Sequence, residues 1–410
     1  MITTNCVNCG AGGQHLVVSL GKQPLANSYL TREQLEQSEP RYPLDFYLCP
    51  ECMLSHIAVV ATSEDIFSDY AYFSSYSTTW LEHAERYTGM ICERLGLGPD
   101  SFAVEIASND GYLLQYMHAR GVPCLGIEPA ANIAAVAREK GIDTEVCFWG
   151  AETATRLLGS RPGADLIIGN NVFAHTPDPN DLIEGIRLFL KPEGVATLEF
   201  PHLYRLIGET QFDTIYHEHF SYYALFVVEK MAANHGMAVF DVEELPTHGG
   251  SLRVYLRHAD HHALSVSGRV AEVRNRELEA GMNTRAYYDR FGANVEKVRA
   301  GLLAFLAEAR QAGKRVAAYG APAKGNTLLN YCGVTAGDIL YTLDRNPHKQ
   351  GLHLPGTHIP IRAPEFAAED QPDYMLILPW NLKKEIMEQM AHVRDWGCRF
   401  VVPIPELRVL

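Results

Sequence analysis

The sequence predicts an α/β protein in three parts: a small N-terminal metal-binding module and two domains that are each built on a mostly parallel sheet. Four cysteines form two Cys-x-x-Cys pairs near the N-terminus. Short apolar runs then alternate with helical segments, and a second alternating stretch follows a long helical region, which is the pattern of doubly wound sheets. We expect the parts to span residues 1–75, 76–262 and 263–410.

Composition excludes several classes of protein. The chain has 410 residues, of which 47% are hydrophobic, and a net charge of -14. That charge disfavours nucleic acid or an anionic membrane as the partner, because phosphates are bound by clustered Lys and Arg. The sequence contains neither an apolar run of about 18 residues nor a signal-peptide pattern. We therefore expect a cytoplasmic protein. We also expect it to be a monomer.

The cysteine pairs Cys6-x-x-Cys9 and Cys49-x-x-Cys52 predict a zinc site. Nine cysteines, an odd number, indicate a reducing compartment rather than a disulfide framework. Four thiolates fill the tetrahedral shell of Zn²⁺ and leave no position for water, so the site is predicted to be structural. The alternative, a redox pair, usually lies where a strand enters a helix and would not occur twice.

The stretch "VEIASNDGYLL" follows an apolar strand and opens a helix, so its backbone N–H groups would face a ligand. It is not GxGxxG. Glu105 precedes the turn, and Glu128 ends the next strand, where an acid suits a ribose. Without glycines to hold a diphosphate, the turn favours S-adenosylmethionine over NAD. The alternative is an ordinary α/β turn with incidental acids.

The fourth strand of this unit ends in "GNNVFAHTPD", where ligands of α/β sheets bind. His175 lies there, and a purely structural role for it remains open. The residues expected to bind the cofactor are Glu105, Ser108, Asp110, Gly111, Glu128, Asn170 and Asn171.

A second glycine turn, "AYGAPAKGNTLLNY", precedes a helix in the C-terminal part. It lacks the GxxxxGK[ST] spacing, so ATP hydrolysis is not predicted. A lysine beside a helix N-terminus would suit a diphosphate that is bound and left intact; a turn that only forms the fold is the alternative. Together with "THGGSLRVY", this turn supplies the expected substrate-binding residues Ser251, Arg253, Lys324 and Asn326.

The stretch "DTIYHEHFSYY", residues 213–223, is unusually rich in titratable groups. Three interpretations are open: a metal site, an acid–base apparatus, or a polar surface loop. It is not HExxH, and a fourth metal ligand is not visible. If the stretch is extended, Tyr216 and Glu218 face one way and the two histidines the other. If it is a turn, Glu218 can orient a histidine.

Taken in order, the cysteine pairs, "EIASNDGYLL", "FAHTPD", "YHEHFSYY", "HGGSLRVY" and "YGAPAKGNT" resemble the S-adenosylmethionine-dependent C-methyltransferases of nucleotide-linked deoxysugars, above all the sugar 3-C-methyltransferases of actinomycete antibiotic pathways. The resemblance covers nearly the whole chain. It implies a zinc-binding module, a Rossmann-like methyltransferase domain, and a second Rossmann-like domain that helps to hold a dTDP-linked 4-keto deoxysugar. The family's functional residues match Tyr70, His175, Tyr216, Glu218 and His219.

Carbon methylation requires a carbanion equivalent, which a neighbouring ketone supplies once its α-proton is removed. The reaction needs a base and donors for the oxyanion. We expect His219 to be the base, with Glu218 as its orienting or electrostatic partner. His175 and Tyr216 are expected near the keto oxygen, and Tyr70 is expected to close over the sugar. His175 or Tyr216 as the base remains open.

Two other functions are weighed against this one. An NAD(P)-linked oxidoreductase would need a GxGxxG motif, which neither glycine turn has. A non-catalytic zinc-scaffold protein would leave the cluster of His, Tyr and Glu unexplained.

Overall fold

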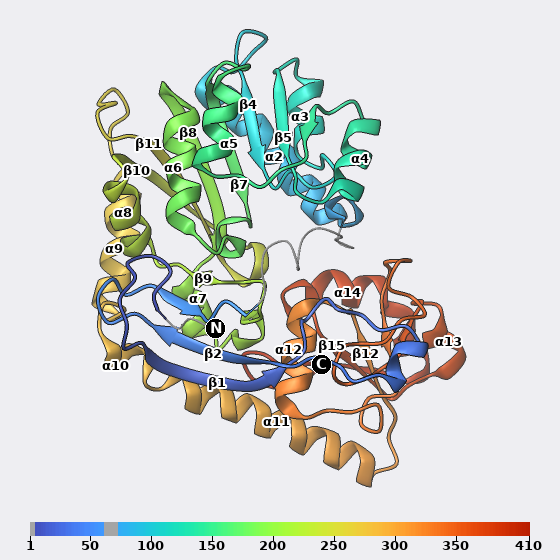
Figure 1. Cartoon of the computed structure of the whole chain (residues 1–410). Coiled ribbons are helices and arrows are strands. Elements are labelled where there is room, and N and C mark those ends of the chain that lie inside the picture. Colours follow the sequence, from blue (N-terminus) through green and yellow to red (C-terminus); the bar gives the residue numbers. More distant parts are fainter. Residues whose placement is uncertain (1–4, 61–72) are drawn as a thin grey trace.

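The computed structural model describes residues 5–60 and 73–410, and its strands form three sheets. Figure 1 shows the largest sheet at the top, the N-terminal sheet below it, and the C-terminal domain beside the latter. The α/β class and the division into a cysteine-bearing module and two α/β units confirm the predicted fold class.

The N-terminal sheet is antiparallel and has the order β1-β2-β3-β9. Its strands are β1 (His15–Gln23), β2 (Tyr42–Leu48), β3 (Ser55–Ile57) and β9 (Ser221–Tyr222). The last strand comes from the central part of the chain: Ser55 pairs with Tyr222, and His56 pairs with Ser221. The "YHEHF" segment, which directly precedes β9, is therefore fastened to the N-terminal module.

The central sheet has the order β10-β11-β8-β7-β4-β5-β6. The strands from β8 to β6 run parallel to their neighbours, while β10 and β11 add an antiparallel edge. The strands are β4 (Ala103–Ile106), β5 (Cys124–Ile127), β6 (Thr144–Glu145), β7 (Ala164–Asn170), β8 (Leu190–Pro201), β10 (Met237–Leu245) and β11 (Ser251–His258).

Helices cover both faces of this sheet. Leu166 and Ile168 of β7 pack with α2 and α3, whereas Ile167 packs on the opposite face with α5 and α6, as the alternation along a strand requires. The helices of this region are α2 (Thr78–Leu95), α3 (Leu114–Ala119), α4 (Ala131–Glu139), α5 (Ala151–Leu158), α6 (Pro179–Phe189), α7 (Leu203–Gly208), α8 (Leu225–Asn234) and α9 (Gly268–Glu279).

The C-terminal sheet has the order β14-β13-β12-β15-β16-β17, parallel except for β17. Its strands are β12 (Val316–Tyr319), β13 (Thr342–Leu343), β14 (Ile361–Arg362), β15 (Tyr374–Ile377), β16 (Arg399–Val402) and β17 (Arg408–Val409). The helices before and within this domain are α10 (Arg285–Tyr288), α11 (Phe291–Gln311), α12 (Ala323–Cys332), α13 (Phe366–Asp370) and α14 (Lys383–Gln389).

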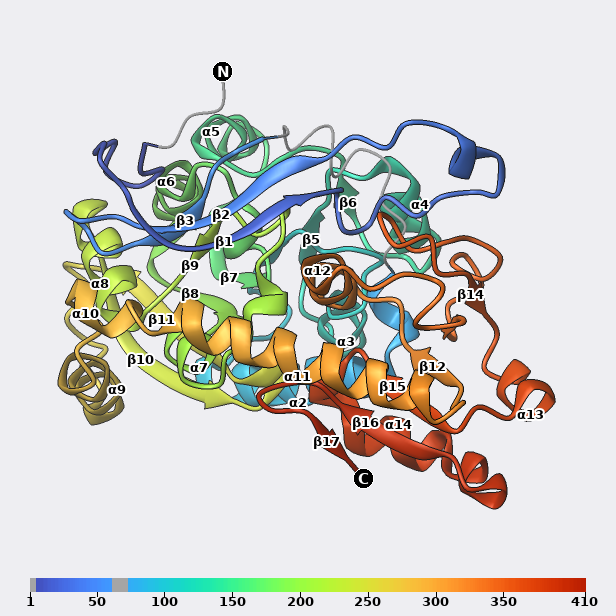
Figure 2. The same ribbon diagram turned by 90° about the horizontal axis from the view of Figure 1, so that it is seen from below.

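Helix α11 ties the parts together. Figure 2 shows it running beneath the N-terminal strands and on to the C-terminal domain, and both α11 and α12 contact β1. Single hydrogen bonds reinforce this arrangement: Asn326 donates to the carbonyl of Ala26 at 2.6 Å, and Tyr29 donates to the carbonyl of Ala321 at 2.5 Å. The glycine turn of the C-terminal domain is thus held by the N-terminal module.

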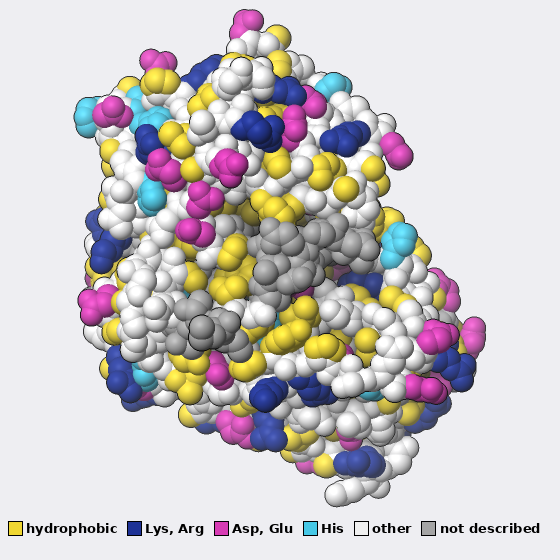
Figure 3. All heavy atoms as spheres, in the orientation of Figure 1, with side chains coloured by type: hydrophobic (Ala, Val, Ile, Leu, Met, Phe, Trp, Pro, Cys, Tyr) yellow, Lys and Arg dark blue, Asp and Glu magenta, His cyan; other side chains and the backbone are white. Residues whose placement is uncertain are grey.

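Among the helices in the part of the chain that the structure describes, none is both long and apolar enough to cross a membrane. On the face seen in Figure 3, acidic and basic side chains are interspersed around the outside. Apolar side chains gather between the central and C-terminal domains.

Candidate active site

A cavity of about 1310 Å³ lies where the carboxyl ends of the central strands face the C-terminal domain. The residues that line it come from the central domain, the C-terminal domain and the N-terminal module, to which Asn27 belongs. Of the predicted site residues, those that line it are Glu128, Asn170, Asn171, His175, Tyr216, His219 and Lys324. Apart from the four cysteines, the described site candidates that are not part of the lining are Glu105, Ser108, Asp110, Gly111, Glu218, Ser251, Arg253 and Asn326.

The turn between β4 and α3 brings its backbone to the cavity. Ala107 and Asn109 line the cavity and adopt positive φ angles of 54° and 50°, which non-glycine residues rarely adopt outside functional turns. The Glu128 carboxylate accepts hydrogen bonds from the N–H groups of Asn109 (3.0 Å) and Ala130 (2.9 Å). Burial raises the pKa of Glu128. Its carboxylate keeps lone pairs for a ligand hydroxyl.

Four of the predicted cofactor residues support this turn from behind. Asp110 pairs with Lys140 at 3.1 Å. Gly111 has a φ of +75°, and a Cβ there would lie 3.2 Å from Ile142. Glu105 and Ser108 are fully buried, and burial raises the pKa of Glu105 well above its usual value. These four residues support the turn and do not line the cavity.

Asn171 and His248 form a strained pair in the cavity wall. Each has a φ of 53° although neither is glycine, and their side chains lie 3.0 Å apart, from Nδ2 to Nε2. Asn171 Oδ1 is buried without a hydrogen-bond partner among the described residues. Backbone strain of this kind clusters at ligand sites. Sequence reasoning missed His248; its only signal was the Gly-Gly turn that follows it.

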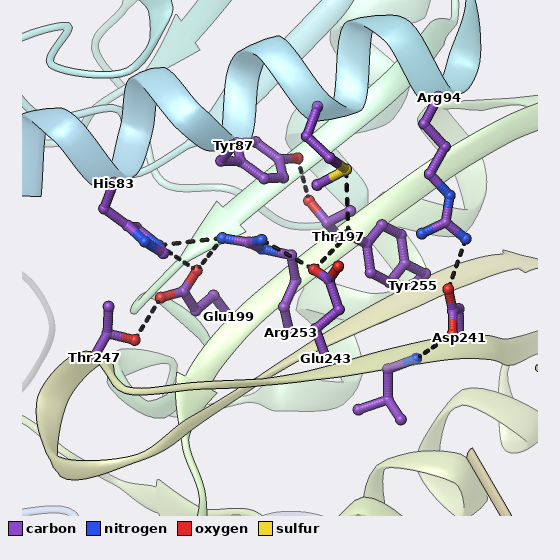
Figure 4. A network of polar contacts seen from close by, with 12 residues as sticks. His83, Tyr87, Arg94, Thr197, Glu199, Asp241, Glu243, Thr247, Arg253 and Tyr255 are labelled. Carbon is purple, nitrogen blue, oxygen red and sulfur yellow. Dashed lines mark hydrogen bonds and ion pairs between the residues drawn. The ribbon is translucent and has the colours of Figure 1, made fainter. Parts of the chain in front are cut away.

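A buried polar network holds the adjoining wall (Figure 4). Glu199 Oε2 accepts a hydrogen bond from Arg253 at 2.7 Å and lies 2.9 Å from His83 Nε2. Arg253 also donates to Glu243 at 3.1 Å and lies over the Tyr87 ring. The predicted substrate ligand Arg253 is thus paired with two carboxylates behind the wall. It secures His83, which lines the cavity.

Ser251 and Asn326 likewise hold loops together. The Ser251 hydroxyl donates to the carbonyl of Thr247 at 3.0 Å, and Asn326 donates to Ala26 as described above. A direct contact of either residue with substrate stays a prediction.

The "YHEH" segment forms a turn, so the extended alternative is wrong: the N–H of His219 donates to the carbonyl of Tyr216 at 2.9 Å. His219 Nδ1 lies 2.9 Å from the carbonyl of Thr214, which can only accept, so Nδ1 carries the proton. Nε2 therefore has the free lone pair, and it accepts a hydrogen bond from the Tyr216 hydroxyl at 2.8 Å.

His175 lies against this turn, with its ring centroid 4.6 Å from that of His219. Its ring hydrogen-bonds the backbone carbonyl of Glu218. Burial lowers the pKa of His175 to about 4. The pKa of His219 is lowered well below its usual value, first by burial and then by the nearby His175. Both imidazoles are neutral at neutral pH and can accept a proton.

The Glu218 carboxylate is held by Asn27, whose Nδ2 lies 2.7 and 2.9 Å from its two oxygens. Thr214 and Tyr216 bond both ring nitrogens of His219 and so orient it. An electrostatic role for the Glu218 carboxylate stays a prediction. His217 donates to the carbonyl of Pro43 at 3.2 Å. The partner Asn27 was missed because it lies 191 residues from Glu218.

Among the residues that the structure describes, the side chains that gather closely enough to hold a metal ion are those of Cys6, Cys9, Cys49 and Cys52, and none of them comes from the His-Glu-His segment. Their sulfur atoms all lie within 4.8 Å of one another. Each Cys-x-x-Cys forms a tight knuckle; for example, the N–H of Gly10 donates to the carbonyl of Cys6 at 2.8 Å. This geometry fits a tetrahedral thiolate site.

Comparisons with known proteins match the chain along its length. Three families match: "Putative zinc binding domain" at residues 6–67, "Methyltransferase domain" at 80–242 and "C-methyltransferase C-terminal domain" at 246–405. The chain is 36% identical over 407 residues to the C-methyltransferase NovU of Streptomyces niveus, covering 99% of this chain and 96% of that one.

The chain belongs to the S-adenosylmethionine-dependent C-methyltransferases. Solved structures of lower similarity include magnesium protoporphyrin IX methyltransferase from Synechocystis PCC 6803 with bound SAM (12% identity, TM-score 0.33, 43% of this chain and 80% of that one). Another is the PH0226 protein of Pyrococcus horikoshii OT3 (16% identity, TM-score 0.36, 48% of this chain and 97% of that one).

The site of this C-methyltransferase fits both groups that the family uses. S-adenosylmethionine is its methyl donor, and the free oxygen of Asn171 and the carboxylate of Glu128 offer acceptors to the donor's polar groups. The four cysteines form its structural zinc site. Tyr70, which was expected to close over the sugar, lies outside the residues that the structure describes.

Proposed function

We propose that this C-methyltransferase methylates C3 of a dTDP-linked 4-keto deoxysugar, by deprotonation to an enolate followed by direct methyl transfer, in the biosynthesis of a branched antibiotic sugar. The observation that carries the proposal is the pair Tyr216–His219. A neutral imidazole, whose Nε2 lone pair accepts a hydrogen bond from the Tyr216 hydroxyl, lies in a cavity that also contains the glycine turn of the methyltransferase domain.

The pair supplies what an α-proton abstraction needs. His219 Nε2 accepts the proton from C3 while Thr214 keeps the ring in the right tautomer. The Tyr216 hydroxyl, which now donates to Nε2, turns to the keto oxygen as the substrate approaches. S-adenosylmethionine supplies an electrophilic methyl on a sulfonium. A metal ion is not needed at this end of the cavity.

The nucleotide is assigned to the wall that the C-terminal domain contributes. Gly320 and Ala321 line that wall, and Arg345 and Lys349 add positive charge to it. The chain is similar to a single C-methyltransferase over nearly its full length, which supports the proposal that one sugar nucleotide occupies the whole cavity. The thiolate zinc site favours action in a reducing compartment, the cytoplasm.

Proton exchange tests the proposal. In D₂O, with S-adenosylhomocysteine and no methyl donor, the enzyme should exchange the C3 proton of a dTDP-4-keto deoxysugar. With S-adenosylmethionine it should give a product whose added methyl lies on C3. A methyl found on an oxygen or nitrogen of the sugar would refute the proposal.

A further inference from the structure

The side chain of Lys324 enters the cavity from the start of α12 into surroundings that suit a cation. Its Nζ donates to Asn381 Oδ1 at 3.0 Å and lies 4.9 Å from the centre of the Trp380 ring. Trp380 Nε1 in turn donates to the buried Asp213 carboxylate at 2.7 Å, whose negative charge acts on Lys324. An amide oxygen, an indole face and a carboxylate all stabilise positive charge.

This ammonium lies beside the proton-abstracting turn, because its helix α12 packs against the 3-10 turn Phe212–Thr214, and the carbonyl of Thr214 holds His219. Its charge contributes to lowering the pKa of both His219 and His248, after burial. Burial lowers the pKa of Lys324 itself, and Asp213 opposes that change. By contrast, Arg345 is exposed, and Lys349 donates to the carbonyl of Ala321 at 2.9 Å.

The same surroundings argue against a diphosphate as the partner of Lys324. A diphosphate is permanently anionic, and the buried Asp213 carboxylate would repel it. An enolate oxygen is different, because its charge exists only after the proton has left. A cation that Asp213 already balances in the resting enzyme can stabilise such a transient charge without binding the neutral ketone strongly.

We propose that Lys324 donates a hydrogen bond to the oxyanion that forms when His219 removes the proton beside the ketone. This assignment rests on the function proposed above. The C–H bond breaks and its proton goes to His219 Nε2. Its electron pair forms the C=C bond of the enolate, and the carbonyl π pair moves onto the oxygen, which Lys324 stabilises without giving up its own proton. Methyl transfer to the carbon restores the carbonyl, and His219 then releases its proton to water.

The test separates the oxyanion from the diphosphate. Lys324→Met should bind thymidine diphosphate within about threefold of the wild-type affinity by calorimetry, while C3 proton exchange at saturating sugar nucleotide falls about 10²–10³-fold, as for loss of an oxyanion donor. The matched control is Arg345→Met, at the same cavity, which should weaken thymidine diphosphate binding more than it slows exchange. S-adenosylhomocysteine binding checks that both variants fold.

Rescue and pH dependence provide a second readout. Lys324→Arg should recover part of the exchange rate and move the alkaline limb of the pH profile upward, because guanidinium keeps its proton. The proposal is overturned if Lys324→Met loses thymidine diphosphate affinity but exchanges normally at saturation, or if neither quantity changes. Failure of the wild-type enzyme to exchange the proton would instead refute the proposed function.

Discussion

The Tyr216 hydroxyl donates a hydrogen bond to His219 Nε2 across 2.8 Å, within a turn that one backbone hydrogen bond closes. The two side chains are three residues apart and lie on the same side of the turn. Because the opposite ring nitrogen donates to Thr214, the imidazole cannot change tautomer without losing that bond. The lone pair of the proposed base is therefore aimed before substrate arrives.

Replacing the base should stop deprotonation but not binding. We expect His219→Asn to reduce C3 proton exchange in D₂O by about 10²–10⁴-fold, the usual effect of losing a general base. Affinities for S-adenosylhomocysteine and thymidine diphosphate should stay close to wild type in calorimetry. The matched control is His217→Asn in the same turn, whose ring bonds Pro43 instead. If His219→Asn exchanged at the wild-type rate, the base would be His175 or Tyr216.

The acid limb of the pH profile should lie below the usual histidine range. Burial lowers the pKa of His219 well below its usual value, so the imidazole stays neutral, and able to accept a proton, to lower pH. We expect kcat/KM to be level between about pH 6.5 and neutrality and to fall only in more acidic solution. An acid limb centred at or above pH 6.5 would contradict this assignment of the base.

Glu128 should serve the donor and not the sugar nucleotide. Glu128→Gln keeps one acceptor for the N–H groups of Asn109 and Ala130 but weakens the bond to a ribose hydroxyl. We expect S-adenosylhomocysteine to bind about tenfold more weakly, equivalent to about 1.4 kcal/mol. Thymidine diphosphate binding should not change. Glu145→Gln, on the neighbouring strand β6, is the control, and an equal loss of both ligands would count against the assignment.

Asn27 should influence the rate although it belongs to the N-terminal module. Asn27→Ala removes the donor that holds Glu218 and loosens the turn that carries His219. A lost hydrogen bond to a charged group costs about 1.5–3 kcal/mol, so exchange should slow about tenfold or more at unchanged ligand affinity. Asn27→Asp should be worse, since two carboxylates would then face each other. Wild-type rates in both variants would exclude this role.

Removing zinc should disable the enzyme at a distance. We expect about one zinc ion per chain by elemental analysis, and Cys6→Ser should unfold the N-terminal module, because metal binding energy is folding energy at such sites. The carbonyl of Ala26 and the side chain of Tyr29 would then release the C-terminal glycine turn. Full activity after complete zinc removal by a chelator would refute a structural role.

Features that depend on local spacing were predictable from the sequence. The cysteine knuckles, the β4–α3 turn and the alternating strands of both parallel sheets each depend on residues close together in the chain. The antiparallel strands β10 and β11 were not singled out, and β9 has only two residues, too few for a periodic signal. Its pairing with β3 joins residues that are 165 and 167 positions apart in the chain, which no local pattern can reveal.

The partners of the predicted site residues were mostly beyond prediction for the same reason. A motif identifies Glu218 and Arg253 as candidate site residues. It does not show that Asn27 hydrogen-bonds Glu218 or that Arg253 pairs with Glu199. Lys324 shows the converse: its position before a helix suggested a phosphate, and only the nearby Asp213 and Trp380 indicate another use.

The pairing of β9 with β3 bears on how this enzyme can be rebuilt. The turn with Tyr216 and His219 is encoded in the methyltransferase domain, yet it leads straight into a strand of the N-terminal sheet. A chimera that exchanges only the first part of the chain would bring a foreign β3 edge and a foreign counterpart of Asn27 against this turn. Grafts meant to alter sugar choice should therefore join chains so that residues 213–223 travel with the N-terminal module, and not at the apparent domain boundary.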